Sequence, residues 1–253
     1  VTVRSLKTGE VWQEAADEVV ANVTVQNLLK LLGEDTNPKY PKSLKQIVNR
    51  PTSLLGMKNY QDRAQKLSYP SGAFVIYLGV KQQAIPDKCP PHLQFLYDYQ
   101  GPIGENNSLF VSVSKPGDGR APQGQATIIA SSFVEAAKWW CVSEEDYQGL
   151  KQEYTQEAIA RLNSYFHLTR ENIIHQEAAT PRTFAHFTAR ENGIVGGIGQ
   201  RISTFGPFGF ATRTPIEHLW LVGDSVHPGE GTAGVSYSAL TVARQISGNL
   251  AKL

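Results

Sequence analysis

Short apolar or alternating stretches recur through the middle of the chain, a pattern that is typical of β-strands. The connections between them are short, and one of them, KPGDGRAPQG, is rich in turn-forming residues. Short connections favour antiparallel neighbours, because a parallel pair of strands needs a long crossover. The predicted strands cover residues 74–80, 93–99, 108–114 and 125–131.

A helical period follows this predicted sheet. Ser143 stands three residues before Asp146, as at a capped helix start. Apolar side chains then recur at helical spacing, so we expect this helix to cover one face of the sheet. The spaced positions are Tyr147, Leu150, Tyr154, Ala158, Leu162 and Phe166, and a fifth strand is predicted at 171–178.

The start of the chain carries a separate set of elements. The turn residues around Thr8 predict a hairpin, and the apolar residues 16–23 predict a strand. Thr24 is suited to cap a short helix that Gly33 closes. The following segment, 34–53, is rich in Pro, Lys and Asn, and we expect it to be a connection with at most one helical turn.

Composition narrows the class of protein. The chain has 253 residues, 41% of them hydrophobic, and a formal net charge of +1, so charge gives no case for nucleic-acid binding. Cys89 and Cys141 lie far apart, which favours a reducing compartment over a disulfide scaffold or a zinc site. The apolar stretch 73–80 is too short to span a membrane. Because the chain begins at Val1 without an initiator Met, we expect a fragment of a longer protein.

The candidate chemistry lies near the end of the chain, where GEGTAG spells G-x-G-x-x-G with Gly229, Gly231 and Gly234. A dinucleotide-binding fingerprint opens a strand–helix–strand unit with an acidic residue about 20 positions later. Only 19 residues follow Gly234, and none of them is Asp or Glu. The ordinary fingerprint interpretation therefore fails.

The same residues fit a different kind of ligand-binding site. The apolar residues 219–222 predict a buried strand, and Gly223 and Asp224 follow at its carboxyl end, where ligands bind in open α/β sheets. The glycines permit close approach to the backbone, and a helix beginning near 232–235 points its first N–H groups at the same place. A carboxylate beside bare amides suits a flavin nucleotide, which offers both hydroxyls and an electron-rich ring carbonyl. The backbone amides proposed as donors belong to Thr232, Ala233 and Val235.

These residues also carry a family resemblance. The stretch TPIEHLWLVGDSVHPGEGTAGVSYSALTVARQI resembles the C-terminal FAD-binding signature of phytoene-desaturase-like flavoproteins, which include carotenoid desaturases and isomerases within the amine-oxidase-like superfamily. TPRTFAHFTARENGIVGG and VWQEAADEVVANVTVQNLL resemble other pieces of the family, the latter placing Asn22 at the end of an FAD-domain strand. Cyanobacterial-type carotenoid 3′,4′-desaturases are the expected nearest group.

The resemblance implies a mixed α/β (α+β) fold. Residues 1–35 and 212–253 would be segments of an incomplete FAD-binding α/β domain, and 36–211 an antiparallel-sheet substrate-binding domain with helices. Family members open with a glycine-rich pyrophosphate turn that the chain lacks before Gly229. We therefore expect the chain by itself to be inactive. Asn22, Gly223, Asp224, Gly231 and Gly234 join the three amide donors as expected FAD-binding residues.

The resemblance also implies a reaction. The leading hypothesis is desaturation of a carotenoid polyene by hydride transfer to FAD, with transient contact at a membrane surface and a cytoplasmic, peripheral location. Carotenoid cis–trans isomerisation, an amine-oxidase-like activity and a non-catalytic apolar-ligand module stay open. No acid–base pair, metal site or oligomeric state is indicated, so no catalytic residue is named. Aromatic side chains are expected to wall an apolar substrate tunnel, namely Phe184, Phe187, Phe205 and Phe208.

Overall fold

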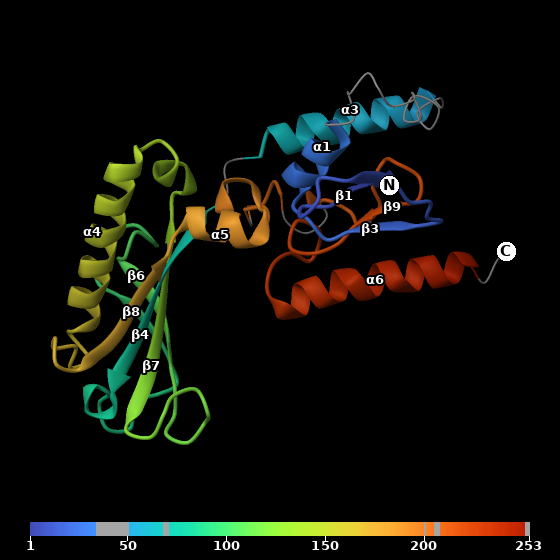
Figure 1. The fold of residues 1–253 in the computed structure, drawn as a ribbon. Helices are drawn as coiled ribbons and strands as arrows, with labels where there is room; N and C mark the ends of the chain where they lie inside the picture. The colour runs from blue at the N-terminus through green and yellow to red at the C-terminus, as the bar shows by residue number, and fades with distance from the viewer. Residues whose placement is uncertain (34–50, 68–70, 200, 205–207, 251–253) are drawn as a thin grey trace. The chain divides into compact units, whose positions relative to one another are not determined.

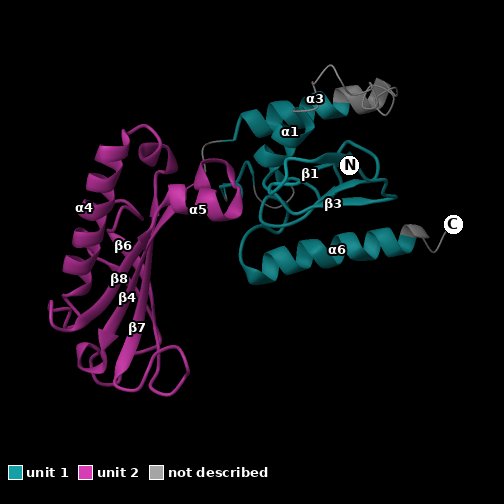
Figure 2. Cartoon of the chain, viewed as in Figure 1, with its two compact units in different colours: residues 1–68, 196–253 teal, residues 69–195 magenta. Residues whose placement is uncertain are grey.

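The structure, a computed structural model, describes residues 1–33, 51–67, 71–199, 201–204 and 208–250. The chain divides into two compact units (Figure 2). Unit 1 combines both ends of the chain, Val1–Ser68 and Gly196–Leu253. Unit 2 is the continuous segment Tyr69–Val195. Helices and an antiparallel sheet occur together, so the predicted mixed α/β class is confirmed.

Unit 2 is built on a five-stranded antiparallel sheet with the order β5-β6-β7-β4-β8. The antiparallel arrangement confirms the prediction from sequence. Short connections account for the pairs β5–β6 and β6–β7, whereas β4 pairs with two strands that are distant in sequence, β7 and β8. The predicted strands all form, although β5 ends before Tyr97 and Tyr99. The strands are β4 (Gly72–Lys81), β5 (His92–Leu96), β6 (Ser108–Val113), β7 (Gln125–Val134) and β8 (Ile173–Ala179).

Helix α4 (Glu144–Leu162) covers one face of this sheet (Figure 1). Ser143 caps it, because its Oγ accepts the Asp146 N–H at 3.1 Å. The predicted helical stripe is buried at Tyr147, Tyr154 and Leu162, where it meets the inward-facing side of the strands. The core centres on Phe74 and Trp139, whose stacked rings lie 6.0 Å apart.

Several short helices of unit 2 follow no long apolar period. Helix α5 (Pro181–Thr188) begins with proline in its first turn, and Thr180 and Thr183 form a capping box there. This helix was not predicted from sequence, because eight residues hold too few turns to show an apolar period. The 3-10 helices are η1 (Gln82–Ala84), η2 (Ala136–Trp139) and η3 (Glu191–Gly193).

The strands of unit 1 are short. The predicted hairpin is confirmed as β1 (Thr2–Arg4) and β2 (Val11–Gln13), which pair antiparallel. The two predicted strands near opposite ends of the chain, β3 (Val19–Ala21) and β9 (Leu219–Leu221), form a parallel pair. This pair positions the candidate site, because parallel strands direct their carboxyl ends to the same edge.

Three helices pack around these strands. Helix α1 (Val25–Gly33) is capped by Thr24 as predicted, since the Thr24 Oγ1 accepts the Asn27 N–H at 3.1 Å. Helix α6 (Thr232–Leu250) is the predicted final helix. Helix α3 (Pro51–Gln65) begins at the end of the segment 34–53, and most of it lies beyond that segment, where no element was predicted. The predicted connection at 34–50 lies outside the described residues.

The structural division differs from the predicted boundaries after residues 35 and 211. Tyr60 of α3 packs edge-on against Phe210, with ring centroids 5.0 Å apart. Both belong to the same core as Val25 and Leu221, which joins α3 and 208–210 to the terminal segments. The assignment of 36–211 as a substrate-binding domain stays a prediction. Within the described part of the chain, no helix is both long and apolar enough to cross a membrane.

Candidate functional site

The carboxyl ends of β3 and β9 bring together two predicted residues. Asn22 follows β3 and Gly223 follows β9, and the Val222 N–H donates to the Ala21 carbonyl at 2.9 Å between them. A Cβ built on Gly223 would lie 2.8 Å from the Asn22 Oδ1, and the φ of Gly223 is +109°. Only glycine meets both requirements without strain. Segments from opposite ends of the sequence therefore meet here.

Two buried serines hold the loop that leads from β9 to α6. The Gly223 N–H donates to the Ser238 Oγ of α6 at 3.0 Å. The Ser225 Oγ accepts the Val25 N–H at the start of α1, at 3.3 Å. Ser225 is thus engaged inside the core, which argues against a nucleophilic role. The loop is fixed to helices on two sides.

Glycines outside this loop accommodate it. A Cβ on Gly197 would overlap the Asp224 carbonyl, and one on Gly196 would overlap the Glu230 carboxylate. A Cβ on Gly234 would lie 2.5 Å from the carbonyl oxygen of Gly229. The segment 196–197 and the first turn of α6 are therefore packed directly on the loop.

We call the site formed by Asn22, Gly223 and Asp224 the corner, and it is acidic. Asp224 is half-buried. Glu230 is exposed, but partial desolvation of its carboxyl raises its pKa, and the nearby charge of Asp224 raises it further. The amino end of α6 opposes this repulsion, because the helix dipole places partial positive charge there. The arrangement supplies carboxylate acceptors beside amide donors.

The first turn of α6 supplies those donors. Thr232 and Ala233 are exposed, and a helix leaves its first N–H groups without intrahelical partners. The Val235 N–H already donates to the Gly231 carbonyl at 3.0 Å. A ligand contact through the Val235 amide would therefore compete with the helix, whereas Thr232, Ala233 and Gly234 are better placed to donate. The φ of Gly231 is +88°, so the loop turns into the helix at a glycine.

These residues fit a flavin nucleotide. Its hydroxyls need acceptors such as the Asp224 carboxylate, and its ring carbonyls need donors such as the amides of Thr232 and Ala233. The overlaps at Gly223 and Gly197 are with atoms of the chain itself, so these glycines permit close packing of the loop, whereas nothing lies within 4 Å of a Cβ on Gly231. Among the residues the structure describes, no group of His, Cys, Asp and Glu side chains is arranged to hold a metal ion.

The predicted substrate residues are distributed over both units. Phe184 and Phe187 lie on α5 in unit 2, and Phe187 is 79% exposed. Phe208 lies in unit 1 and is 58% exposed. Phe205 lies outside the described residues. Their role as tunnel walls stays a prediction.

Three residues that support the corner from behind were not predicted from sequence, namely Ser225, Ser238 and Gly197. Ser225 and Ser238 are fully buried, yet nothing in their sequence context separates them from surface serines. The one available signal for Ser238 is its spacing, because it follows Gly234 by one helical turn.

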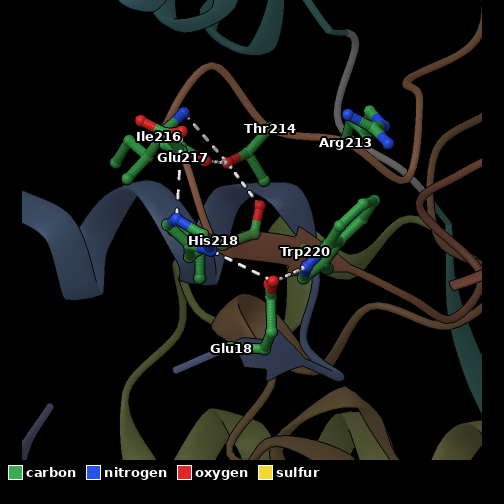
Figure 3. Close-up of a pocket in the computed structure, with 8 residues that line it drawn as sticks. Glu18, Arg213, Thr214, Ile216, Glu217, His218 and Trp220 are labelled. Carbon is green, nitrogen blue, oxygen red and sulfur yellow. Dashed lines mark hydrogen bonds and ion pairs between the residues drawn. The ribbon is translucent and has the colours of Figure 1, made fainter. Parts of the chain in front are cut away.

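The opposite edge of the β3–β9 pair holds a hollow of about 150 Å³ (Figure 3). The Glu18 carboxylate lies between two partners there. It accepts the Trp220 Nε1–H at 2.6 Å, and its other oxygen lies 3.0 Å from the His218 Nδ1. The remaining lining residues are Arg213, Thr214, Ile216, Glu217 and Leu219.

Comparison with known proteins adds relatives to this geometry. No protein-family model matches the chain. The chain is 29% identical to a chloroplastic prolycopene isomerase of Daucus carota over 198 residues, which are 75% of the chain and 32% of that protein. It is 28% identical to chloroplastic prolycopene isomerase 1 of an Oncidium hybrid cultivar over 245 residues, 93% of the chain and 38% of the relative.

The chain thus spans about a third of the length of the curated relatives it matches. The relatives support the resemblance to carotenoid desaturases and isomerases of the phytoene-desaturase-like group, and they do not single out the 3′,4′-desaturases. The chain that contains the corner at Asn22, Gly223 and Asp224 is thus similar to prolycopene isomerases.

Proposed function

We propose that the chain forms part of an FAD-dependent enzyme that acts on a carotenoid polyene, and that the corner at the carboxyl edge of the β3–β9 pair binds the flavin. One observation carries the proposal. Asn22 and Gly223 lie together at the carboxyl edge of the β3–β9 pair, where open α/β sheets bind ligands, Asp224 follows directly, and Ser238 of α6 binds the Gly223 amide. The similarity to prolycopene isomerases supports the same class of substrate.

Each residue has a distinct task in this proposal. The Asp224 carboxylate accepts a hydrogen bond from a ribityl or ribose hydroxyl. The amides of Thr232, Ala233 and Gly234 donate to the electron-rich edge of the ring. Gly231 leaves the backbone bare, so that the ring lies against it, whereas Gly223 leaves room for Asn22. FAD, when bound, supplies the redox chemistry, and the chain orients it and excludes water.

Two reactions on the polyene are compatible with this site. Desaturation removes two hydrogens across a C–C bond, whereas isomerisation turns a double bond and leaves the composition unchanged. The naming of the relatives as isomerases favours isomerisation. The mass of the product distinguishes the two, because only desaturation lowers it. The proposal includes a peripheral location at a membrane surface, because the carotenoid substrate is insoluble in water and would reach the enzyme from the membrane.

The test is an FAD titration of the full chain, with flavin fluorescence as the measure of binding. The family's first glycine-rich turn has no counterpart before Gly229, so we expect weak binding. Asp224→Ala should weaken it by about tenfold or more, because a hydrogen bond to a charged group contributes roughly 1.5–3 kcal/mol.

Glu10→Gln is the matched control, since it removes an exposed carboxylate elsewhere in unit 1. It should leave the dissociation constant unchanged. Equal affinity in Asp224→Ala and the parent chain would remove Asp224 from the cofactor site. A chain that binds a carotenoid but no FAD would instead identify a non-catalytic binding module.

A further inference from the structure

Glu18 joins two strands that lie 200 residues apart in sequence. It directly precedes β3, and His218 directly precedes β9. Its carboxylate binds the His218 ring with one oxygen and the Trp220 indole with the other (Figure 3). We call Glu18, His218 and Trp220 the Glu18 clasp.

We propose that Glu18 is a positioning residue: the Glu18 clasp fixes the register of β3 against β9 and so places Asn22 against Gly223, and protonation of His218 tightens it. The consequence for flavin rests on the function proposed above. The positioning of Asn22 and Gly223 does not, because it concerns only residues of this chain.

The need for such a clasp comes from the length of the strands. β3 and β9 pair over three positions, from Val19↔Leu219 to Ala21↔Leu221. A slip of one residue would exchange the two faces of β9, taking Trp220 away from Val242 and Leu221 out of the core that it shares with Val25. Three paired positions specify register weakly, so a side chain that binds both strands at one end decides which alignment is stable.

The clasp also reaches α6, which forms the other side of the corner. Trp220 is buried against Val242 of that helix. The Arg213 guanidinium lies over the Trp220 ring at 4.8 Å from its centroid. Arg213 in turn donates from Nε to the Gln245 Oε1 of α6 at 2.9 Å. A shift at the clasp is therefore transmitted to both elements that bear the candidate flavin contacts.

Charges around His218 make the clasp sensitive to pH. Glu18 faces it across the strands, Glu217 lies 3.8 Å from its Nε2, and Asp17 is also close. The hydrogen bond to Glu18 raises the pKa of His218, with smaller contributions from the charges of Glu18, Glu217 and Asp17. Arg213 is a positive group nearby. Gln245 of α6 is neutral.

The signs of the two titrations define a window. Hydrogen bonds from Trp220 and then His218 lower the pKa of Glu18, so its contribution is present above its unfolded pKa and is lost as pH falls through the lowered value. The contribution of His218 is present below its unfolded pKa and is lost as pH rises through the raised value. The clasp is therefore tightest in mildly acidic solution and loosens at alkaline pH.

The experiment is an NMR titration of the full chain from mildly acidic to alkaline pH. It follows the His218 ring, the Trp220 indole N–H and the Gly223 amide, which lies at the far end of β9. We expect all three signals to change with one midpoint. Glu18→Gln keeps an acceptor for the indole but removes the charge, so the His218 midpoint should fall towards about 6.5 and the Gly223 shift should become flat.

Two further variants keep the test decisive. His218→Asn suits the left-handed backbone at this position, where φ is +63°, and it should abolish the pH response of Gly223 while the fold is retained. Glu217→Gln removes a neighbouring charge but not the indole bond, and the response should persist. The proposal is overturned if the Gly223 signal of the parent chain does not change as His218 titrates. It is also overturned if this signal changes equally with pH in Glu18→Gln.

An FAD titration of the same proteins separates the two proposals. We expect the parent chain to bind FAD roughly fivefold more weakly at alkaline than at mildly acidic pH, and Glu18→Gln to show no such change. If Gly223 follows His218 but no variant binds FAD, the clasp stands and the proposed flavin site fails. If FAD binds with equal affinity at both values of pH, the clasp does not govern the corner.

Discussion

At the residue scale, the candidate site depends on close contacts that one methyl group would disrupt. Gly223 lies against Asn22 with a φ of +109°, and its amide is held by Ser238. Asp224 follows it directly, so any displacement of Gly223 moves the proposed cofactor ligand as well. The geometry of the corner thus depends on Gly223, although glycine has no side chain with which to contact a ligand.

Gly223→Ala should lower the free energy of unfolding of the chain by about 1–3 kcal/mol, because alanine is strained at this φ. It should also weaken FAD binding, since Asp224 moves with it. Urea unfolding and the FAD titration measure the two effects.

Gly248→Ala is the control for this prediction, because nothing lies within 4 Å of its Cβ position on α6. It should leave stability unchanged or raise it. The double variant Asn22→Gly with Gly223→Ala removes the contact but not the strained φ. Recovery should therefore be partial, and an undisturbed single variant Gly223→Ala would refute the close-packing argument.

At the element scale, local signals in the sequence set where helices begin. Ser143 accepts the Asp146 N–H at the start of α4, and Thr24 accepts the Asn27 N–H at the start of α1. Both caps were predicted from sequence, because a cap acts within one helical turn. Helix α4 in turn supplies the face that buries the sheet of unit 2.

Ser143→Ala should destabilise unit 2 by about 1 kcal/mol, because it leaves a backbone N–H at the start of α4 without its acceptor. The expected result is a lower midpoint of urea unfolding with an unchanged slope. Ser143→Asp keeps an acceptor and adds a favourable charge at the helix start, so its midpoint should match the parent chain. Equal loss in both variants would count against a capping role.

At the scale of the whole molecule, the two units differ in how the chain builds them. Unit 2 is one continuous segment with its own core around Phe74, Ile128 and Trp139. Unit 1 joins both ends of the chain, and its parallel pair needs a strand from each. Unit 1 therefore depends on long-range closure, whereas unit 2 does not.

Residues 69–195 expressed alone should consequently fold, with a single cooperative thermal transition and the circular dichroism of an α+β protein. Leu162→Ala within this segment should lower its stability by about 2–5 kcal/mol, since Leu162 is fully buried in the core. A segment that lacks a cooperative transition would show that unit 2 requires the rest of the chain.

The sequence by itself determined the individual strands of the antiparallel sheet, the capped helices and the strand–glycine–aspartate order before α6, because each is encoded by neighbours within a few residues. It also indicated most residues of the corner, since turn glycines and a following helix leave a local signature. It did not reveal α3 or α5, where the apolar period is weak or short. The pairing of β4 with β7 and β8 joins distant segments and was decided by the fold.

Only the tertiary structure decided which strand stands beside β9 in register, and that Ser225, Ser238 and Gly197 support the corner from behind. It alone showed Glu18 bound to His218 and Trp220. The physical reason is that these contacts join residues far apart in the chain. The sequence around a carboxylate, a serine or a glycine does not indicate which distant residue it contacts in the folded protein.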